Sequence, residues 1–207
     1  SHYAFDTWDL EYNFPMGWRE LEGIANRGAY DLTQHQACSK SSFEVGVDAM
    51  GKKVLPEVVC EPSLGVGRAF IVFMLEAYEY DKKRDNVVLH LHPRLAPYKA
   101  AVFPIVKGDA YEKMAEKIVF DLRKEWNVTY DKSGSVGRRY SRADEIGVPV
   151  TIVVDEQSLK DKSITMRDRD STRQIRVRIT ELDDIMRKIM DDKNLLKLGK
   201  VVKTRVK

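Results

Sequence analysis

The sequence predicts an α/β (α+β) protein in two parts: an antiparallel sheet with a covering helix, then a layered α/β domain with a mostly parallel sheet. In residues 1–97, strand-like alternation recurs without a long helical pattern between the strands. In residues 98–207, short apolar runs alternate with helical patterns, which is typical of a layered domain. A polar segment and two prolines lie between these parts, and we place the domain boundary near Pro97.

The first part is predicted to hold three strands and one long helix. Loose alternation marks strands at 8–14 and 18–24, and an apolar run marks a third strand at 54–60. The apolar segment 66–80 has the length of a helix and is expected to cover the sheet. A polar excursion, residues 33–53, joins the second strand to the third.

The second part alternates strands with helices. Apolar runs of strand length occur at 100–106, 128–130, 147–154, 163–166 and 175–179. Residues 109–126 and 181–190 carry apolar side chains at helical spacing. We expect the last two strands to form an antiparallel hairpin at the edge of the sheet, with the alternating charges of residues 166–170 at its tip.

Composition excludes several classes of protein. The chain has 207 residues, 43% of them hydrophobic, which is ample for a buried core. No apolar run approaches the ~20 residues of a membrane span, and no secretory leader opens the chain. The two cysteines are too few for a disulfide framework, so we expect reduced thiols in a cytoplasmic protein.

Charge is distributed unevenly between the two parts. Residues 1–97 carry 10 Lys and Arg against 14 Asp and Glu, or −4, and residues 98–207 carry 25 against 18, or +7. A basic half of this kind is a candidate for a polyanionic partner, most often a nucleic acid. The alternative is a solvated lysine-rich tail, since residues 193–207 hold six basic side chains and no acid.

Residues 61–68 hold an acid, a hydroxyl, two glycines and an arginine around one bend. Glu61 and Ser63 are two apart, so on an extended backbone they share a face and can hold a primary ammonium. Gly65 and Gly67 let a ligand approach the backbone. Arg68 begins a helix, where its guanidinium and the free N–H groups suit phosphate. The alternative is a turn whose glycines only provide positive φ.

Two further clusters of polar residues are candidates for binding. Glu20 and Glu22 share one face of a strand, and paired carboxylates suit Mg²⁺; the alternative is a solvent-facing strand edge. Arg27 and Asp31 in the next turn can pair with each other. His90 and His92 are two apart, but strand packing explains them better than a metal does, and we expect no zinc.

The glycine- and serine-containing residues 133–142 resemble a phosphate-gripping loop, without the Gly-Lys-Ser/Thr ending of a P-loop. Arginines for phosphate and Tyr140 for base stacking suit single-stranded or loop RNA. The arginines are Arg138, Arg139 and Arg142. The alternative is a helix N-terminus with an exposed basic face. Asp144 and Glu145 are candidate partners of these arginines.

These motifs, in order along the chain, resemble glycyl-tRNA synthetase. Residues 8–35 and 61–68 are similar to the C-terminal part of its class II catalytic domain, and 61–68 resembles motif 3 of that class. Residues 95–99, 133–147 and 167–171 resemble its anticodon-binding domain. The resemblance therefore implies a catalytic-domain portion at 1–97 and an anticodon-binding domain at 98–207.

The resemblance implies a glycine–tRNA ligase that activates glycine with ATP and transfers it to tRNA(Gly). The implied glycine-binding residues are Glu61, Pro62, Ser63, Leu64 and Gly65, with Glu61 and Ser63 on the amino group. The implied ATP-binding residues are Glu20, Leu21, Gly65, Val66, Gly67 and Arg68. Glu20 and Arg68 are the implied catalytic residues, with Glu20 on Mg²⁺ and Arg68 on the terminal phosphates. The basic domain would read the anticodon, with Arg138, Arg139 and Arg142 on tRNA.

The resemblance also carries expectations about the whole protein. A homodimer without membrane attachment is implied for the full-length enzyme. Gly67 departs from the acid that often precedes the motif 3 arginine. Motifs 1 and 2 would lie upstream of His2, so we expect a synthetase fragment that is inactive by itself.

Two other functions remain open at this point. One is a non-catalytic nucleic-acid-binding accessory protein of synthetase-like fold, and the other is a stand-alone tRNA-binding module. The intact set of candidate catalytic side chains favours the enzyme. Glycine-dependent exchange between ATP and pyrophosphate would separate these functions.

Overall fold

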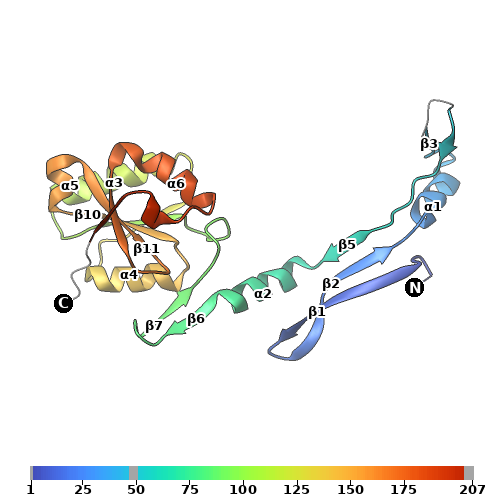
Figure 1. Cartoon of the computed structure of the whole chain (residues 1–207), viewed down its shortest axis with the longest axis horizontal. Coiled ribbons are helices and arrows are strands. Elements are labelled where there is room, and N and C mark those ends of the chain that lie inside the picture. The colour runs from blue at the N-terminus through green and yellow to red at the C-terminus, as the bar shows by residue number, and fades with distance from the viewer. Residues whose placement is uncertain (1, 47–50, 203–207) are drawn as a thin grey trace. The chain divides into compact units, whose positions relative to one another are not determined.

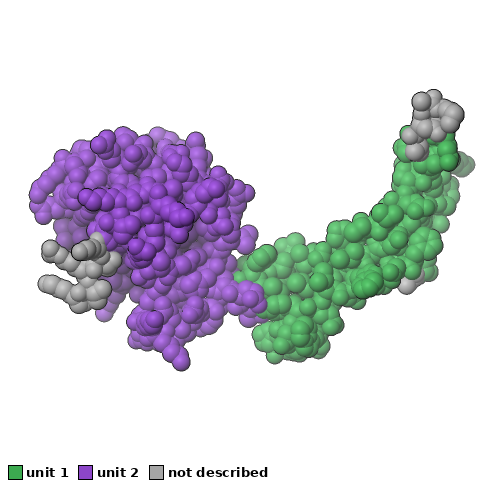
Figure 2. Space-filling model, viewed as in Figure 1, with its two compact units in different colours: residues 1–73 green, residues 74–207 purple. Residues whose placement is uncertain are grey.

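The computed structural model describes residues 2–46 and 51–202, which fall into two compact units (Figures 1 and 2). The first unit is Ser1–Phe73 and the second is Met74–Lys207. The compact division lies earlier than Pro97 because the intervening hairpin packs with the second unit. The domain boundary near Pro97 stays a prediction.

The first unit is built on a three-stranded antiparallel sheet in the order β1-β2-β5 (Figure 1). Its strands are β1 (Asp6–Phe14), β2 (Gly17–Asn26) and β5 (Glu61–Leu64). The predictions of strands at 8–14 and 18–24 are confirmed. Gly17 has a φ of 96° in the tight turn between β1 and β2, a conformation that favours glycine.

The predicted strand at 54–60 is wrong. There the structure has only the end of the short strand β4 (Lys53–Val54), paired with β3 (Val45–Gly46), and one isolated bridge from Val58 to Gly28. The segment contains Pro56, which cannot donate to a strand ladder. Val59 is 64% exposed, so the apolar run faces no core in this unit.

Helix α1 (Tyr30–Ser39) occupies part of the predicted polar excursion at 33–53. The helix has no buried residue, so the sequence shows no apolar stripe that would have predicted it. It ends at Lys40, which adopts the left-handed conformation at φ 56°. The part of the excursion at 47–50 lies outside the described residues.

The predicted helix at 66–80 is confirmed as α2 (Val66–Ala77), with an earlier end. Its predicted last turn instead forms β6 (Tyr78–Asp81), which pairs antiparallel with β7 (Asn86–Leu89). The polar residues between them form the hairpin turn, where Asp85 has a φ of 50°. The β6–β7 hairpin belongs to the second unit.

The second unit contains a six-stranded sheet in the order β13-β12-β11-β10-β8-β9. The strands are β8 (Ala100–Pro104), β9 (Val128–Tyr130), β10 (Val150–Val154), β11 (Ser163–Asp168), β12 (Gln174–Arg178) and β13 (Lys200–Val202). Strand β8 runs parallel to both of its neighbours, and the other three pairings are antiparallel. The α/β class is confirmed, but the sheet is mixed rather than mostly parallel.

The predicted β11–β12 hairpin is confirmed, but it does not lie at the sheet edge. Strand β13 pairs with β12 and covers that side of the hairpin. The sequence did not indicate β13 because its three residues are too few to show a period and its first two side chains are exposed.

Helices cover both faces of this sheet (Figure 1). They are α3 (Asp109–Leu122), α4 (Val136–Glu145), α5 (Glu156–Asp161) and α6 (Leu182–Met190), with short 3₁₀ turns at Ile179–Glu181 and Leu195–Lys197. Helices α3 and α6 bury their apolar stripes in the larger core cluster, together with Val102 and Ile152. Helix α4 packs on the other face, where Ala143 meets Ala101 and Phe103. Because side chains alternate along β8, that one strand serves both cores.

Two compositional expectations can be compared with this fold. Within residues 2–46 and 51–202, no helix combines the length and apolar character needed to cross a membrane. Cys38 and Cys60 are free and exposed thiols, as predicted.

Candidate functional site

The register of the three-stranded sheet places the candidate catalytic side chains on one face. Residues directly opposite each other on neighbouring strands share a face. Glu61 on β5 pairs with Ala25 on β2. Two residues further along β5, Ser63 pairs with Gly23 on β2, which pairs in turn with Asp9 on β1. A Cβ added at Gly23 would lie 3.6 Å from carboxylate oxygens of both Asp9 and Glu20, so Glu20 lies on this face too. We name the side-chain set Asp9, Glu20, Glu61 and Ser63 the acidic face.

The expectation that Glu20 and Glu22 share a face is wrong. Glu20 pairs with Glu11, but Glu22 pairs with Leu10, because the register shifts at this point. Leu21 is the extra residue of the resulting β-bulge. The bulge turns Glu22 to the opposite face, and the carboxylate residue paired with Glu20 is Glu11 on β1.

The predicted glycine-binding residues divide between the two faces of β5. Glu61 and Ser63 lie on the acidic face, as their spacing predicted. Pro62 and Leu64 pair with Ile24 and Glu22 and therefore lie on the other face. Only the backbone of these two residues is available to a ligand on the acidic face.

Glu61 has a partner that the sequence did not indicate. Arg27 Nη1 lies 3.0 Å from Glu61 Oε2, while Nε and Nη2 of the same guanidinium donate to Asp31 at 2.5 and 2.6 Å. The hydrogen bonds from Arg27 lower the pKa of Asp31, and the same bonds raise the pKa of Arg27. Arg27 therefore pairs with Asp31 and also orients the Glu61 carboxylate.

Arg68 lies in the first turn of α2 and contacts the acidic face. Its Nη1 donates to the Glu20 carbonyl oxygen and lies 3.8 Å from Glu20 Oε2. Both side chains are about half exposed, at 50% for Arg68 and 52% for Glu20. An exposed pair of this kind contributes roughly 0–1 kcal/mol. Arg68 can therefore exchange this contact for an anionic ligand at little cost.

The glycines beside Arg68 are not explained by backbone conformation. Neither Gly65 nor Gly67 is among the residues with positive φ, so the simple-turn alternative is not supported. A Cβ added at Gly67 would meet nothing within 4 Å, and one at Gly65 would only touch the Arg68 side chain. With the 85% exposed Val66, they form an open approach to the helix start.

The carboxylates of the described residues do not form a complete metal site. No group of three or more His, Cys, Asp or Glu side chains in that part of the chain could hold a metal ion. Glu20 can supply one oxygen ligand, and Mg²⁺ commonly takes its remaining ligands from phosphate and water. His90 follows β7 and lies between two carboxylates, those of Glu79 at 3.0 Å and Asp170 at 2.6 Å.

In the second unit, the predicted arginine loop becomes the N-terminus of α4. Ser135 caps the helix, with its hydroxyl accepting from the Arg138 N–H at 3.4 Å. Arg138 is exposed. Arg142 is 46% exposed and binds Asp131 and the Ser133 carbonyl. The helix N-terminus with an exposed basic face, given above as the alternative, describes this segment.

Arg139 is buried and Tyr140 is partly buried, and the expected roles of both residues change. Arg139 is 3% exposed and donates to the carbonyls of Pro104 and Gly134. Tyr140 packs edge-on against Phe103 at 5.8 Å and under the Arg167 guanidinium at 4.6 Å, so base stacking on its ring is ruled out. Burial raises the pKa of Tyr140. The signal was available: Arg139 lies four residues before Ala143, on the apolar face of the helix.

Asp144 does not pair with the nearby arginines of the loop. It is 2% exposed and accepts from both terminal nitrogens of Arg167 at 2.9 Å. Arg84 approaches it at 3.3 Å. The alternating charges at residues 166–170 were interpreted as structural, which agrees with the burial of Arg167 and Arg169. The sequence did not indicate Arg84 or the pairing of Asp144 with Arg167.

The chain is similar to known proteins in sequence. Residues 99–189 match the anticodon binding domain. The glycine–tRNA ligase of Caldanaerobacter subterraneus is 46% identical over 185 residues, which are 88% of this chain and 40% of that ligase. The ligase of Geobacillus thermodenitrificans is also 46% identical, over 187 residues, which are 88% of this chain and 39% of that ligase. The chain is homologous to the glycine–tRNA ligases. The Treponema denticola ligase is 40% identical over 190 residues. The chain thus spans about two-fifths of the length of these curated relatives.

A solved structure has a fold similar to that of this chain. The prolyl-tRNA synthetase of Cryptosporidium parvum, complexed with L-proline and AMP, aligns with 90% of this chain and 37% of its own, at a TM-score of 0.61 and 19% identity. At that identity the likeness shows the fold alone. The fold is that of a class II synthetase, as the resemblance implied.

Proposed function

We propose that this chain is part of a glycine–tRNA ligase, in which glycine is activated with ATP and transferred to tRNA(Gly). The observation that carries the proposal is the acidic face, with Arg68 against its edge. The homology to glycine–tRNA ligases supports it. The alternative of a non-catalytic accessory protein does not account for Glu20, Glu61, Ser63 and Arg68 lying together on one surface.

The proposed glycine site is centred on Glu61 and Ser63. The substrate ammonium would lie between this carboxylate and hydroxyl, with Arg27 holding the carboxylate in place at 3.0 Å. Gly65 would leave room for the substrate beside the backbone. The Pro62 and Leu64 side chains, on the other face, would support the strand.

The proposed ATP site lies at the start of α2. Arg68 would bind the terminal phosphates, aided by the free N–H groups of the first helical turn. Glu20 would contribute one ligand to Mg²⁺, and the bulge residue Leu21 would set the position of Glu20. In the first step, the glycine carboxylate attacks the α-phosphorus and pyrophosphate leaves. In the second, a terminal tRNA hydroxyl attacks the glycyl carbonyl and AMP leaves.

The proposed tRNA surface lies at the N-terminal end of α4. Arg138 is exposed there, and Arg142, which is also exposed, lies one turn further along the same helix. Arg139 would act by fastening the loop to β8 rather than by touching RNA. We further propose a homodimer for the whole protein and a cytoplasmic location.

The overall function is tested by isotope exchange. A protein of the relatives' full length that contains this chain is expected to exchange labelled pyrophosphate into ATP only when glycine is present. Alanine and serine serve as control substrates. Exchange that is absent with glycine, or equal with alanine, would reject the proposed activity.

The RNA surface is tested by Arg138→Ala in the 207-residue chain. We expect weaker binding of a glycine tRNA anticodon stem-loop, with the magnitude of the log–log salt slope reduced by about 1, because one phosphate contact is lost. The control is Arg187→Ala, since Arg187 is also exposed (62%) and pairs with Glu125. Equal affinity and slope for both variants would remove Arg138 from the surface.

A further inference from the structure

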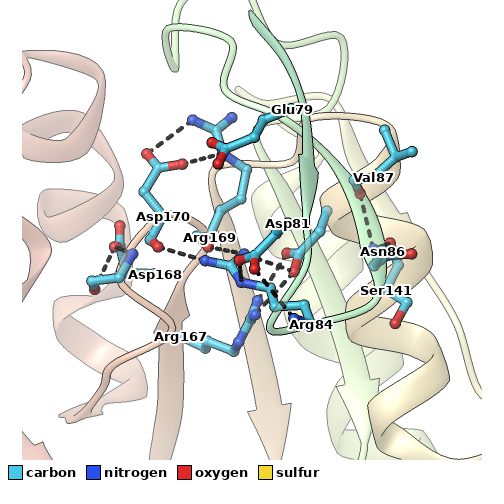
Figure 3. A network of polar contacts seen from close by, with 12 residues as sticks. Glu79, Asp81, Arg84, Asn86, Val87, Ser141, Arg167, Asp168, Arg169 and Asp170 are labelled. Carbon is cyan, nitrogen blue, oxygen red and sulfur yellow. Dashed lines mark hydrogen bonds and ion pairs between the residues drawn. The ribbon is translucent and has the colours of Figure 1, made fainter.

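Arg84, in the turn of the β6–β7 hairpin, hydrogen-bonds the hairpin to other parts of the second unit (Figure 3). Arg84 donates to the carbonyls of Arg169 and Asp170 at 2.7 and 2.6 Å. It also lies 2.8 Å from Asp81, in its own hairpin, and its side chain is only 18% exposed. Because the side chain is mostly covered, the guanidinium is directed toward these carbonyls and carboxylates rather than into solvent.

The same arginine reaches helix α4. Arg84 Nη1 lies 3.3 Å from Asp144 Oδ2, on the last turn of that helix. A second hairpin residue, Asn86, donates from Nδ2 to the Ser141 carbonyl at 3.1 Å and is 9% exposed. The hairpin therefore contacts α4 at two residues that are three apart, and α4 packs beside β7.

The segment after the hairpin is held by the side chains of the same two residues, Arg169 and Asp170. Arg169 is 3% exposed and donates from Nη1 to the carbonyls of Leu91 and Gly147, both at 2.9 Å. Its Nε binds Asp170 at 2.7 Å, and Asp170 in turn binds His90 at 2.6 Å. The hairpin and the loop after α4 are thus held by one polar network.

Helix α4 carries the proposed RNA contacts at its other end. Arg138 lies in its first turn, and Arg139 fixes that turn to β8. A ten-residue helix is rigid over this length, so its direction is set by what holds its two ends. At the C-terminal end, the structure assigns that task to the hairpin and to the Asp144–Arg167 pair.

On this basis we propose that Arg84 and Asn86 are positioning residues for RNA binding. The inference rests on the proposed function of the α4 surface. The hairpin, residues 78–89, therefore contributes to RNA binding, although it precedes residues 99–189, which match the anticodon binding domain. It acts by setting the direction of α4 and touches no RNA.

The proposal predicts a distinctive salt dependence. Arg84→Ala in the 207-residue chain is expected to weaken binding of the glycine tRNA anticodon stem-loop about tenfold, with an unchanged log–log salt slope, because no phosphate contact is lost. Asn86→Ala is expected to weaken it about threefold, again without a change in slope. Hydrogen exchange of the α4 amides should rise in both variants.

The matched control is Arg94→Ala. Arg94 also donates to a carbonyl, that of Met190 at 2.9 Å, and to a carboxylate, that of Asp191 at 2.7 Å, but neither partner lies on α4. The Arg94→Ala variant should bind the stem-loop with the same affinity and the same salt slope as the unmodified chain. If circular dichroism shows that Arg84→Ala does not fold, the stem-loop affinity, salt slope and hydrogen exchange of Asn86→Ala test the proposal instead.

The outcomes separate this inference from the proposed function. If Arg138→Ala weakens binding but Arg84→Ala and Asn86→Ala do not, the positioning role is rejected and the RNA surface stands. If Arg84→Ala lowers the slope by about 1, Arg84 is a phosphate contact and the inference is overturned. If none of the three variants weakens binding, the proposed RNA surface fails as well.

Discussion

Replacing Asp144 with alanine is expected to lower the free energy of unfolding of the second unit by about 3–5 kcal/mol. The carboxylate is 2% exposed, and its partner Arg167 is 7% exposed. Removing the acid leaves the Arg167 guanidinium buried without a counter-charge, and it also deprives Arg84 of one acceptor. Urea unfolding of the 207-residue chain, followed by circular dichroism, measures the loss.

The control for this change is Asp184→Ala. Asp184 is also a helical acid paired with a cation, Lys188 at 2.6 Å, but these side chains are 67% and 48% exposed. A loss within about 0.5 kcal/mol is expected there, since water replaces an exposed partner. Equal losses for the two variants would show that burial of the Asp144 pair does not determine its contribution.

The buried arginines explain where sequence reasoning failed in the second unit. A loop rich in arginine predicted an RNA contact, and the adjacent Asp144 was the obvious local partner. The structure instead pairs Asp144 with Arg167, 23 residues later, because β11 lies in the middle of the sheet and faces α4. Charge content reveals that a segment is basic, but topology decides which of its cations remain free.

The first unit shows the same limit for regular structure. Alternation predicted β1 and β2 because those strands are long enough to show a period. Helix α1 has no buried residue and gave no such signal, and the apolar run at 54–60 is interrupted by Pro56. The separation of Glu20 from Glu22 depends on a bulge at Leu21, which spacing alone does not reveal.

The shared face of Glu61 and Ser63 was predicted correctly even though the strand at 54–60 was not. Glu61 and Ser63 share a face because a period of two holds over any short strand, whichever residues bound it. The contact from Arg68 to Glu20 joins residues 48 apart in the chain. The family resemblance implied that both residues serve one ATP site, but it did not predict this contact, and local patterns could not have revealed it.

Arg68→Ala is expected to reduce the turnover of glycine-dependent pyrophosphate exchange by about 10²- to 10³-fold in a protein of the relatives' full length. The guanidinium is half exposed at the start of α2, against the acidic face, where it would bind terminal phosphates as charge develops on them. Arg68→Lys should recover only part of the loss, since an ammonium keeps the charge but cannot make a bidentate contact.

The control for Arg68 lies on the same sheet. Arg19 precedes Glu20 on β2, but it pairs with Tyr12 and so lies on the face opposite the acidic face. Its guanidinium donates to the Trp18 carbonyl, and Arg19→Ala should leave exchange nearly unchanged. If the two alanine variants lose equal activity, the acidic face is not where ATP is bound. If only Arg68→Ala loses it, the cation must act from the face that carries Glu20, Glu61 and Ser63.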